Sequence, residues 1–114
     1  MTAIYKIMGE ADWAAALRTG VVSPAPVDRR DGYVHLSTDE QVLETARLYF
    51  SGRDDLVAAE FAAEEFGGAV KWEASRGGAL FPHLYADLPA ARAVRARRLV
   101  KTADGGFDFG EEIS

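Results

Sequence analysis

Hydrophobic and polar positions change their spacing along the first half of the chain, and these changes mark the expected elements. Residues 3–7 (AIYKI) alternate apolar and polar side chains, which predicts a strand. Residues 10–20 repeat apolar side chains at helical spacing, carry acids in the first turn and end on glycine, which predicts a helix. Residues 22–32 contain two prolines and a charged cluster, which predicts a long loop. A short strand at 33–37 and the main helix at 38–52 complete this half.

The second half of the chain has mainly the pattern of strands. The predicted strands are residues 55–61, 70–75, 93–101 and 107–109. Residues 62–68 predict a helical turn that ends in glycine, and residues 76–89, with two glycines and two prolines, predict an irregular segment. Two early helices followed by strands indicate an α+β fold in which the strands are antiparallel or mixed.

The composition is typical of a soluble globular protein. The 114 residues are enough for one domain, residues 1–114, with its own hydrophobic core. No apolar run approaches the roughly 20 residues that span a bilayer, and the first residues lack the basic and apolar regions of a signal peptide. Since the chain has no cysteine, disulfides and thiolate chemistry are excluded. We therefore expect a cytoplasmic protein of bacterial type with no membrane segment.

Charge argues against a general affinity for nucleic acid or anionic membranes. The formal net charge is -5, whereas both kinds of binding depend on a positive field. Residues 92–101 (RAVRARRLVK) are the exception, with five basic side chains and no acidic one. Such a run is typical of a solvated strand or helix face. The alternative is a segment that contacts phosphate groups or RNA.

The first candidate for chemistry is the predicted strand at residues 33–37. Successive side chains of a strand point to opposite faces, so Tyr33, His35 and Ser37 are expected on one side. Val34 and Leu36 then face the core. This arrangement would direct an imidazole and a hydroxyl together toward solvent or a cleft.

The same stretch also contains two overlapping helix-start signals. Ser37 with Glu40, and Thr38 with Gln41, each have the spacing of a capping box. One hydroxyl is expected to cap the helix, which leaves the other free for a ligand. A helix N-terminus close to His35 would favour an anionic group. For His35, ligand contact and an ordinary structural hydrogen bond remain equal alternatives.

The second candidate lies in the predicted irregular segment. Arg76 offers a planar fork for phosphate or carboxylate, and Gly77 and Gly78 allow the backbone to approach a ligand closely. His83 and Tyr85 lie on the same side if the chain is extended there. The alternative is a rigid turn whose aromatic residues fill the core.

The two segments together predict one polar cleft. Its expected members are Tyr33, His35, Ser37, Arg76, His83 and Tyr85. A shared cleft requires the two imidazoles to lie close together and neither to be fully buried. No metal is expected, since the histidine spacings of common metal sites are absent. The sequence also lacks the nucleophile elbow of hydrolases and a glycine-rich phosphate loop.

Three stretches of the chain resemble a known family. IYKI, GYVHLSTDEQV and WEASRGGALFPHLYADLP resemble the family of domain of unknown function 952, and the resemblance extends over residues 3–109. It implies a fold similar to that of ADP-ribosyltransferases: a split, mostly antiparallel sheet structure with two main helices, one of them following the ligand-binding strand.

The resemblance also implies roles for particular residues. His35, followed by Leu36 and Ser37, resembles the element that presents a histidine to NAD or ADP-ribose. Arg76 and His83 would be polar partners on the facing segment, and Glu73 is the nearest match to a glutamate that orients the ribose. The candidate catalytic residues are therefore His35, His83 and Glu73. The candidate ligand-binding residues are Tyr33, Ser37, Thr38, Arg76, Gly77, Gly78 and Tyr85.

We therefore expect a cleft for a small anionic ligand such as a phosphorylated nucleotide. NAD is the candidate cofactor, and transfer or hydrolysis at the ribose is the candidate reaction, as in ADP-ribosyltransferases or RNA 2′-phosphotransferases. The alternative is a non-catalytic binding or regulatory domain with structural histidines.

Overall fold

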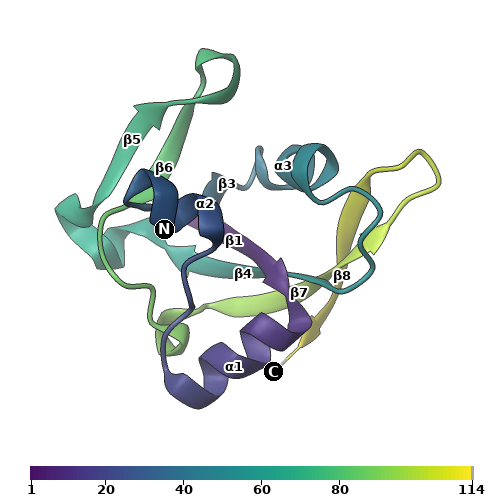
Figure 1. The fold of residues 1–114 in the computed structure, drawn as a ribbon, viewed down its shortest axis with the longest axis horizontal. Coiled ribbons are helices and arrows are strands. Elements are labelled where there is room, and N and C mark those ends of the chain that lie inside the picture. The colour runs from purple at the N-terminus through teal and green to yellow at the C-terminus, as the bar shows by residue number, and fades with distance from the viewer. Residues whose placement is uncertain (114) are drawn as a thin grey trace.

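Two antiparallel sheets form the framework of the molecule (Figure 1). The computed structural model describes residues 1–113. The strands are β1 (Ala3–Gly9), β2 (Val34–His35), β3 (Ser37–Thr38), β4 (Leu56–Ala62), β5 (Val70–Ala74), β6 (Leu80–Leu84), β7 (Arg95–Lys101) and β8 (Phe107–Ile113). Within residues 1–113, a five-stranded sheet has the order β3-β1-β4-β7-β8 and a three-stranded sheet has the order β2-β6-β5. The paired strands run antiparallel, which confirms the predicted α+β class.

The helices are short and lie around these sheets. They are α1 (Glu10–Thr19), α2 (Pro26–Asp31) and α3 (Val42–Tyr49), with the 3-10 turns η1 (Ala63–Ala69), η2 (Arg76–Gly78) and η3 (Ala90–Arg92). The first helix ends where predicted, at Gly20, whose positive φ of 93° suits a residue without a β-carbon. Within residues 1–113, no helix is both long enough and apolar enough to cross a membrane.

The large sheet is buried on both faces. One face contributes Ile4, Met8, Val57, Ala59 and Phe61 to a core that also contains Trp13 of α1 and Val34 and Leu84 of the small sheet. The other face contributes Tyr5, Ile7, Leu56, Ala58 and Leu99 to a second core, which α3 covers with Val42 and Ala46. Because side chains alternate along each strand, β1 and β4 supply both cores at once.

The predicted loop at residues 22–32 contains α2, so that prediction is wrong. Pro26 begins the helix, where the missing N–H costs no hydrogen bond. The carboxylate of Asp28 accepts a hydrogen bond from the backbone N–H of Ala25 at 2.8 Å, which satisfies a donor at the helix start.

The main helix begins at residue 42 rather than at residue 38, and neither Ser37 nor Thr38 caps it with its hydroxyl. Ser37 and Thr38 form β3, which pairs with β1 and takes up the residues expected to cap the helix. The residue at the N-cap position is Gln41, which makes no side-chain cap. Its Oε1 accepts a hydrogen bond from the backbone N–H of Thr38 at 3.0 Å, so one of the two hydrogen bonds of the predicted Thr38–Gln41 box does form.

The predicted strand at residues 33–37 divides between the two sheets at Leu36. The N–H of Leu36 donates to the carbonyl of Pro82 at 3.1 Å, but Pro82 has no N–H to return the bond. The pairing of β2 with β6 therefore stops at His35, and the chain continues as β3 in the large sheet. Leu36 is buried at this crossing.

Two later segments are more regular than expected. Residues 76–89, predicted to be irregular, contain η2 and β6, and β6 is the central strand of the small sheet. The last strand reaches Ile113 instead of ending at residue 109, so Glu111 and Glu112 lie in β8.

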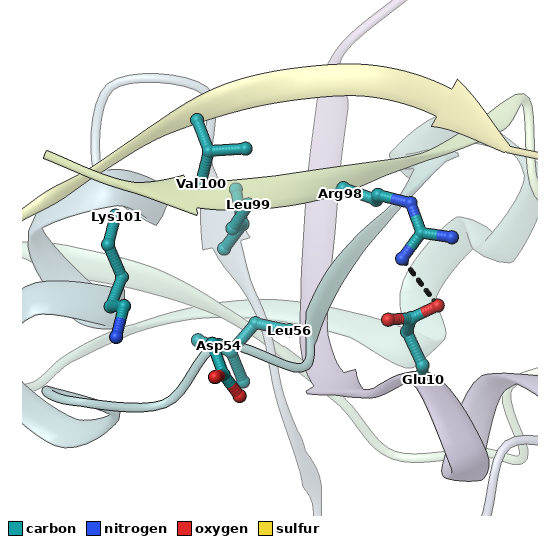
Figure 2. Close-up of a pocket in the computed structure, with 7 residues that line it drawn as sticks. All are labelled: Glu10, Asp54, Leu56, Arg98, Leu99, Val100 and Lys101. Carbon is teal, nitrogen blue, oxygen red and sulfur yellow. Dashed lines mark ion pairs between the residues drawn. The ribbon is translucent and has the colours of Figure 1, made fainter.

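The basic run at residues 92–101 is divided between η3, which ends at Arg92, and β7, and acidic residues from other elements neutralise much of its charge. Arg95 pairs with Glu60 and Glu112. Arg98 pairs with Glu10 and Glu111. Figure 2 shows the Arg98–Glu10 pair at the edge of a small pocket of about 230 Å³, whose lining also includes Leu56, Leu99 and Lys101. Neither histidine lines this pocket.

Packing of the small sheet on the large one depends on the inward side chains of β6. We predict that Leu84→Ala, which removes a fully buried side chain, lowers the free energy of unfolding by about 2–5 kcal/mol. Leu80→Ala is the matched control on the same strand, where the side chain is 56% exposed, and it should change the value by no more than about 0.5 kcal/mol. Urea unfolding measures both, and equal losses would contradict this assignment of the core.

Candidate functional site

Four aromatic rings lie side by side on one face of the small sheet. His35 of β2 stands directly opposite His83 of β6, and alternation places Tyr33 and Tyr85 on the same face. Tyr33 contacts the other three rings, with centroid distances of 4.1 Å to His83, 4.6 Å to His35 and 5.2 Å to Tyr85. The two imidazoles are 5.6 Å apart. The predicted proximity of the two histidines is therefore confirmed.

His35 lies between two carboxylates of α2. Its Nδ1 is 2.7 Å from Oδ1 of Asp28, and its Nε2 is 3.0 Å from Oδ2 of Asp31. A neutral imidazole has one N–H and can donate to only one of them, whereas the doubly protonated ring donates to both. The observed geometry therefore fits an imidazolium that bridges the two carboxylates.

Asp28 is the buried member of this network. Its Oδ1 accepts a hydrogen bond from the backbone N–H of His35 at 3.0 Å, and its Oδ2 accepts one from Nζ of Lys6 at 2.8 Å. Burial alone would raise the pKa of Asp28, but the Lys6 charge and the hydrogen bonds from Lys6 and His35 outweigh it and lower the pKa below 3.8. Lys6 also donates to the carbonyl of His35 at 3.2 Å, so the network fixes both the backbone and the ring of His35.

His83 has a carboxylate partner of its own. Its Nδ1 is 2.8 Å from Oε1 of Glu73, which also accepts a hydrogen bond from the Tyr85 hydroxyl at 2.8 Å. These two hydrogen bonds lower the pKa of Glu73, and the same bond to Glu73 raises the pKa of Tyr85 to about 12. Glu73 is thus occupied by two donors on its own sheet.

The burial of His83 contradicts one of the two conditions set for a shared cleft. That condition was that neither histidine is fully buried, but His83 is only 3% exposed because Tyr33 stacks on its ring and it lies on the central strand. It still lines the large cleft described below. Within residues 1–113, its Nε2 has no hydrogen-bond partner.

Arg76 lies in the cleft without a carboxylate partner among residues 1–113. Its guanidinium covers the ring of Phe81 at 4.9 Å from the centroid, and Nη1 donates to Oγ1 of Thr45 at 3.3 Å. Oγ1 of Thr45 also accepts a hydrogen bond from the buried Ser37 hydroxyl at 3.1 Å. An arginine and two hydroxyls therefore form one polar corner of the cleft.

The cleft that contains both histidines has a volume of about 740 Å³. Its charged lining residues, the histidines apart, are Lys6, Arg30, Arg53, Arg76, Asp12 and Asp31. Basic residues therefore outnumber acidic ones by four to two, although the chain carries a formal net charge of -5. Within residues 1–113, no group of three or more histidine, aspartate or glutamate side chains is arranged to hold a metal ion.

Several predicted residues are not part of the cleft lining. Glu73 and Tyr85 interact beside it, through each other and His83. Thr38 pairs with β1 instead. Gly77 and Gly78 have φ values of 68° and 80°, so glycine is needed there to form the turn η2 and does not bring the backbone into the cleft.

Sequence reasoning missed the residues that organise His35. Pro26 followed by Asp28 is a helix-start signal that could have identified α2 and placed Asp28 and Asp31 on one helix. Lys6 could have been noticed as a charged residue within an otherwise apolar strand. No sequence signal pointed to Thr45, which lies in a regular helix.

Comparison with known proteins identifies the family of this fold. A family model described as "Protein of unknown function (DUF952)" matches residues 7–96. The chain belongs to the DUF952 family. Its fold is similar to that of protein CC0527 from Caulobacter crescentus. With the crystal structure of that protein, the identity is 46%, the TM-score is 0.88, and the match covers 94% of each chain.

A solution NMR structure of CC0527 gives the same result, with 47% identity and a TM-score of 0.83 over 93% of this chain and 91% of that one. The DUF952 fold described here is therefore shared with an experimentally determined structure. No match was found among curated proteins.

The buried charge of Asp28 leads to a stability prediction. Asp28→Asn leaves the ammonium of Lys6 buried without its counter-charge, so the free energy of unfolding should fall by about 3–5 kcal/mol. Asp31→Asn is the matched control on the same helix, and its loss should be much smaller because Asp31 is more exposed. Chemical denaturation measures both, and similar losses would contradict the central role of Asp28.

The lowered pKa of Asp28 also predicts how stability depends on pH. At pH values between the folded and the unfolded pKa of Asp28, the unfolded state binds more protons than the folded state. The stabilisation that ionised Asp28 gives to the folded state is therefore complete above about pH 5 and is lost as the pH falls through the folded pKa. The free energy of unfolding of the wild type should therefore decrease more steeply on acidification than that of Asp28→Asn. Urea unfolding at several pH values tests this, and parallel curves would contradict it.

Proposed function

We propose that the large cleft binds a phosphorylated nucleotide, with NAD and ADP-ribose as the first ligands to test. The observation that carries the proposal is Arg76. Its guanidinium lies over the ring of Phe81 in the cleft and donates one N–H to Oγ1 of Thr45. The remaining N–H groups form a planar donor set that suits two oxygens of a phosphate or carboxylate.

The charge and size of the cleft support an anionic small molecule. Three of its four basic residues already have carboxylate partners, Lys6 with Asp28, Arg30 with Asp31 and Arg53 with Asp55. Arg76 is therefore the cation that the cleft offers to an anion, among the residues that the structure describes. A volume of about 740 Å³ lies within the range of roughly 300–1,000 Å³ that is typical of small-molecule sites. The hydroxyls of Ser37 and Thr45 beside Arg76 add neutral hydrogen-bonding groups.

Aromatic side chains in the cleft support a ligand that carries a base. Tyr33 and Tyr49 line it, and Tyr49 is 66% exposed. Nucleobases stack readily on such rings. The resemblance of the sequence to proteins with the ADP-ribosyltransferase fold favours NAD or ADP-ribose within this class, as an analogy of fold.

The geometry favours binding over transfer or hydrolysis at the ribose. That reaction would need a carboxylate directed at the ligand, and Glu73 was the candidate. Its Oε1 accepts hydrogen bonds from His83 and Tyr85, and the residue does not line the cleft. A non-catalytic binding or regulatory domain is the second candidate function, because both histidines also have a structural role in holding carboxylates.

Nucleotide binding can be tested with ADP-ribose and NAD. We predict that ADP-ribose shifts the NMR signals of Tyr33, His35 and residues around Arg76, and that Arg76→Ala weakens binding roughly 10- to 100-fold through the loss of charged hydrogen bonds. Arg18→Ala, at an exposed arginine outside the cleft, is the matched control and should leave the affinity unchanged. Equal affinities for both variants, or shifts elsewhere on the surface, would contradict the proposal.

A further inference from the structure

The two imidazoles of the cleft have complementary hydrogen-bonding arrangements. Each ring directs Nδ1 at a carboxylate, that of Asp28 for His35 and that of Glu73 for His83. A carboxylate at Nδ1 orients an imidazole and stabilises its protonated form, which leaves Nε2 as the atom that exchanges a proton with a substrate. The rings are 5.6 Å apart on directly opposite residues of neighbouring strands.

The surroundings of the two Nε2 atoms are opposite in kind. Nε2 of His83 has no partner among residues 1–113, although the residue is 97% buried and lines the cleft. With the proton of a neutral ring directed to Glu73, this nitrogen presents a lone pair. Nε2 of His35 instead lies 3.0 Å from Asp31 and is placed to donate a proton. One ring is therefore arranged as a base and the other as an acid.

We propose that His83 and His35 act as general base and general acid in the hydrolysis of a phosphodiester. This inference rests on the proposed function, since the substrate is a nucleotide whose phosphate binds in the cleft. The ring centroids are 5.6 Å apart and both residues line the cleft. Proton transfer requires each Nε2 to come within about 2.6–3.2 Å of the oxygen with which it exchanges a proton.

The reaction balances without a further reactant. A water oxygen forms a bond to phosphorus while Nε2 of His83 accepts a proton from that water. The bond from phosphorus to the leaving oxygen breaks, and that oxygen accepts the proton of Nε2 of His35 in the place that the Asp31 carboxylate occupies in the structure. The products are a phosphate monoester and an alcohol. Proton exchange with solvent then returns both rings to their starting states.

Arg76 lies where it can hold the phosphate during this step. Phe81 and His83 are on the same face of β6, two residues apart, which corresponds to about 6.6–6.8 Å along a strand. Since the guanidinium of Arg76 covers Phe81, the cationic group and the base are neighbours on this wall of the cleft. The guanidinium can then bind the non-bridging oxygens and stabilise the charge that develops on them.

The substrate chosen for the test is adenosine 2′,3′-cyclic phosphate. It is an anionic phosphodiester with a nucleobase, and ring strain makes it reactive toward water with only one acid and one base. We expect the intact protein to convert it to an adenosine monophosphate, which phosphorus-31 NMR detects directly. His83→Gln and His35→Gln should each lower kcat by at least about 100-fold. Arg18→Ala should leave kcat unchanged.

The pH profile separates a catalytic role from a structural one. A bell-shaped profile of kcat/KM is expected. In His83→Gln the fall of kcat/KM at acidic pH, where the base becomes protonated, should disappear. In His35→Gln the fall of kcat/KM at alkaline pH, where the acid loses its proton, should disappear. The ionisable groups around the pair are Asp28, Asp31, Lys6, Tyr33, Lys71, Glu73 and Tyr85. Glu73→Gln provides a second variant if His83→Gln does not fold, and it should lower kcat more than it changes KM.

Separate measurement of binding distinguishes the inference from the proposed function. Binding of adenosine 2′-monophosphate in the cleft by NMR, without hydrolysis of the cyclic phosphate, would overturn the acid–base pair and leave the nucleotide site standing. Absence of both binding and hydrolysis would overturn both. Hydrolysis that persists in both histidine variants would also overturn the pair, because the activity would then come from elsewhere.

Discussion

The carboxylate of Asp28 is buried behind His35, and it has the most demanding environment in this part of the molecule. A buried charge is tolerated only when it is paired and its remaining lone pairs are hydrogen-bonded. Lys6 supplies the counter-charge from β1, and the backbone N–H groups of Ala25 and His35 supply further donors. By satisfying this one group, the fold attaches α2 to both sheets. The orientation of His35 follows from it, because the same carboxylate holds Nδ1 of the ring.

The small sheet connects the hydrophobic core to the cleft through the alternation of its side chains. Val34 and Leu84 face inward and pack on the large sheet, so the opposite face of the same strands must present His35 and His83. Packing on one side therefore determines the pairing of polar groups on the other. A slip of one residue in the register of β2 would turn its side chains over, placing the imidazole of His35 in the core and Val34 in the cleft.

Local patterns in the sequence predicted which residues share a strand face, but not which strands pair. The alternation around His35 and around His83 was sufficient to place each with its neighbouring tyrosine. The pairing of β2 with β6 joins segments that are far apart in sequence, and no local pattern specifies it. At Ser37 and Thr38 the helix-start signal was outweighed by pairing with β1, since tertiary hydrogen bonds can override local propensity. The Asp28–Lys6 pair is of the same long-range kind, so it became apparent only in the structure.

The most direct test of this account is the protonation of the His35 ring, measured by nitrogen-15 NMR of the imidazole at neutral pH. The arrangement around Asp28 and Asp31 predicts a proton on Nδ1 whose own resonance is strongly deshielded by the hydrogen bond to Asp28. This proton resonance should disappear in Asp28→Asn. A neutral His35 ring protonated only at Nε2, unaffected by Asp28→Asn, would contradict the claim that the buried carboxylate organises the site.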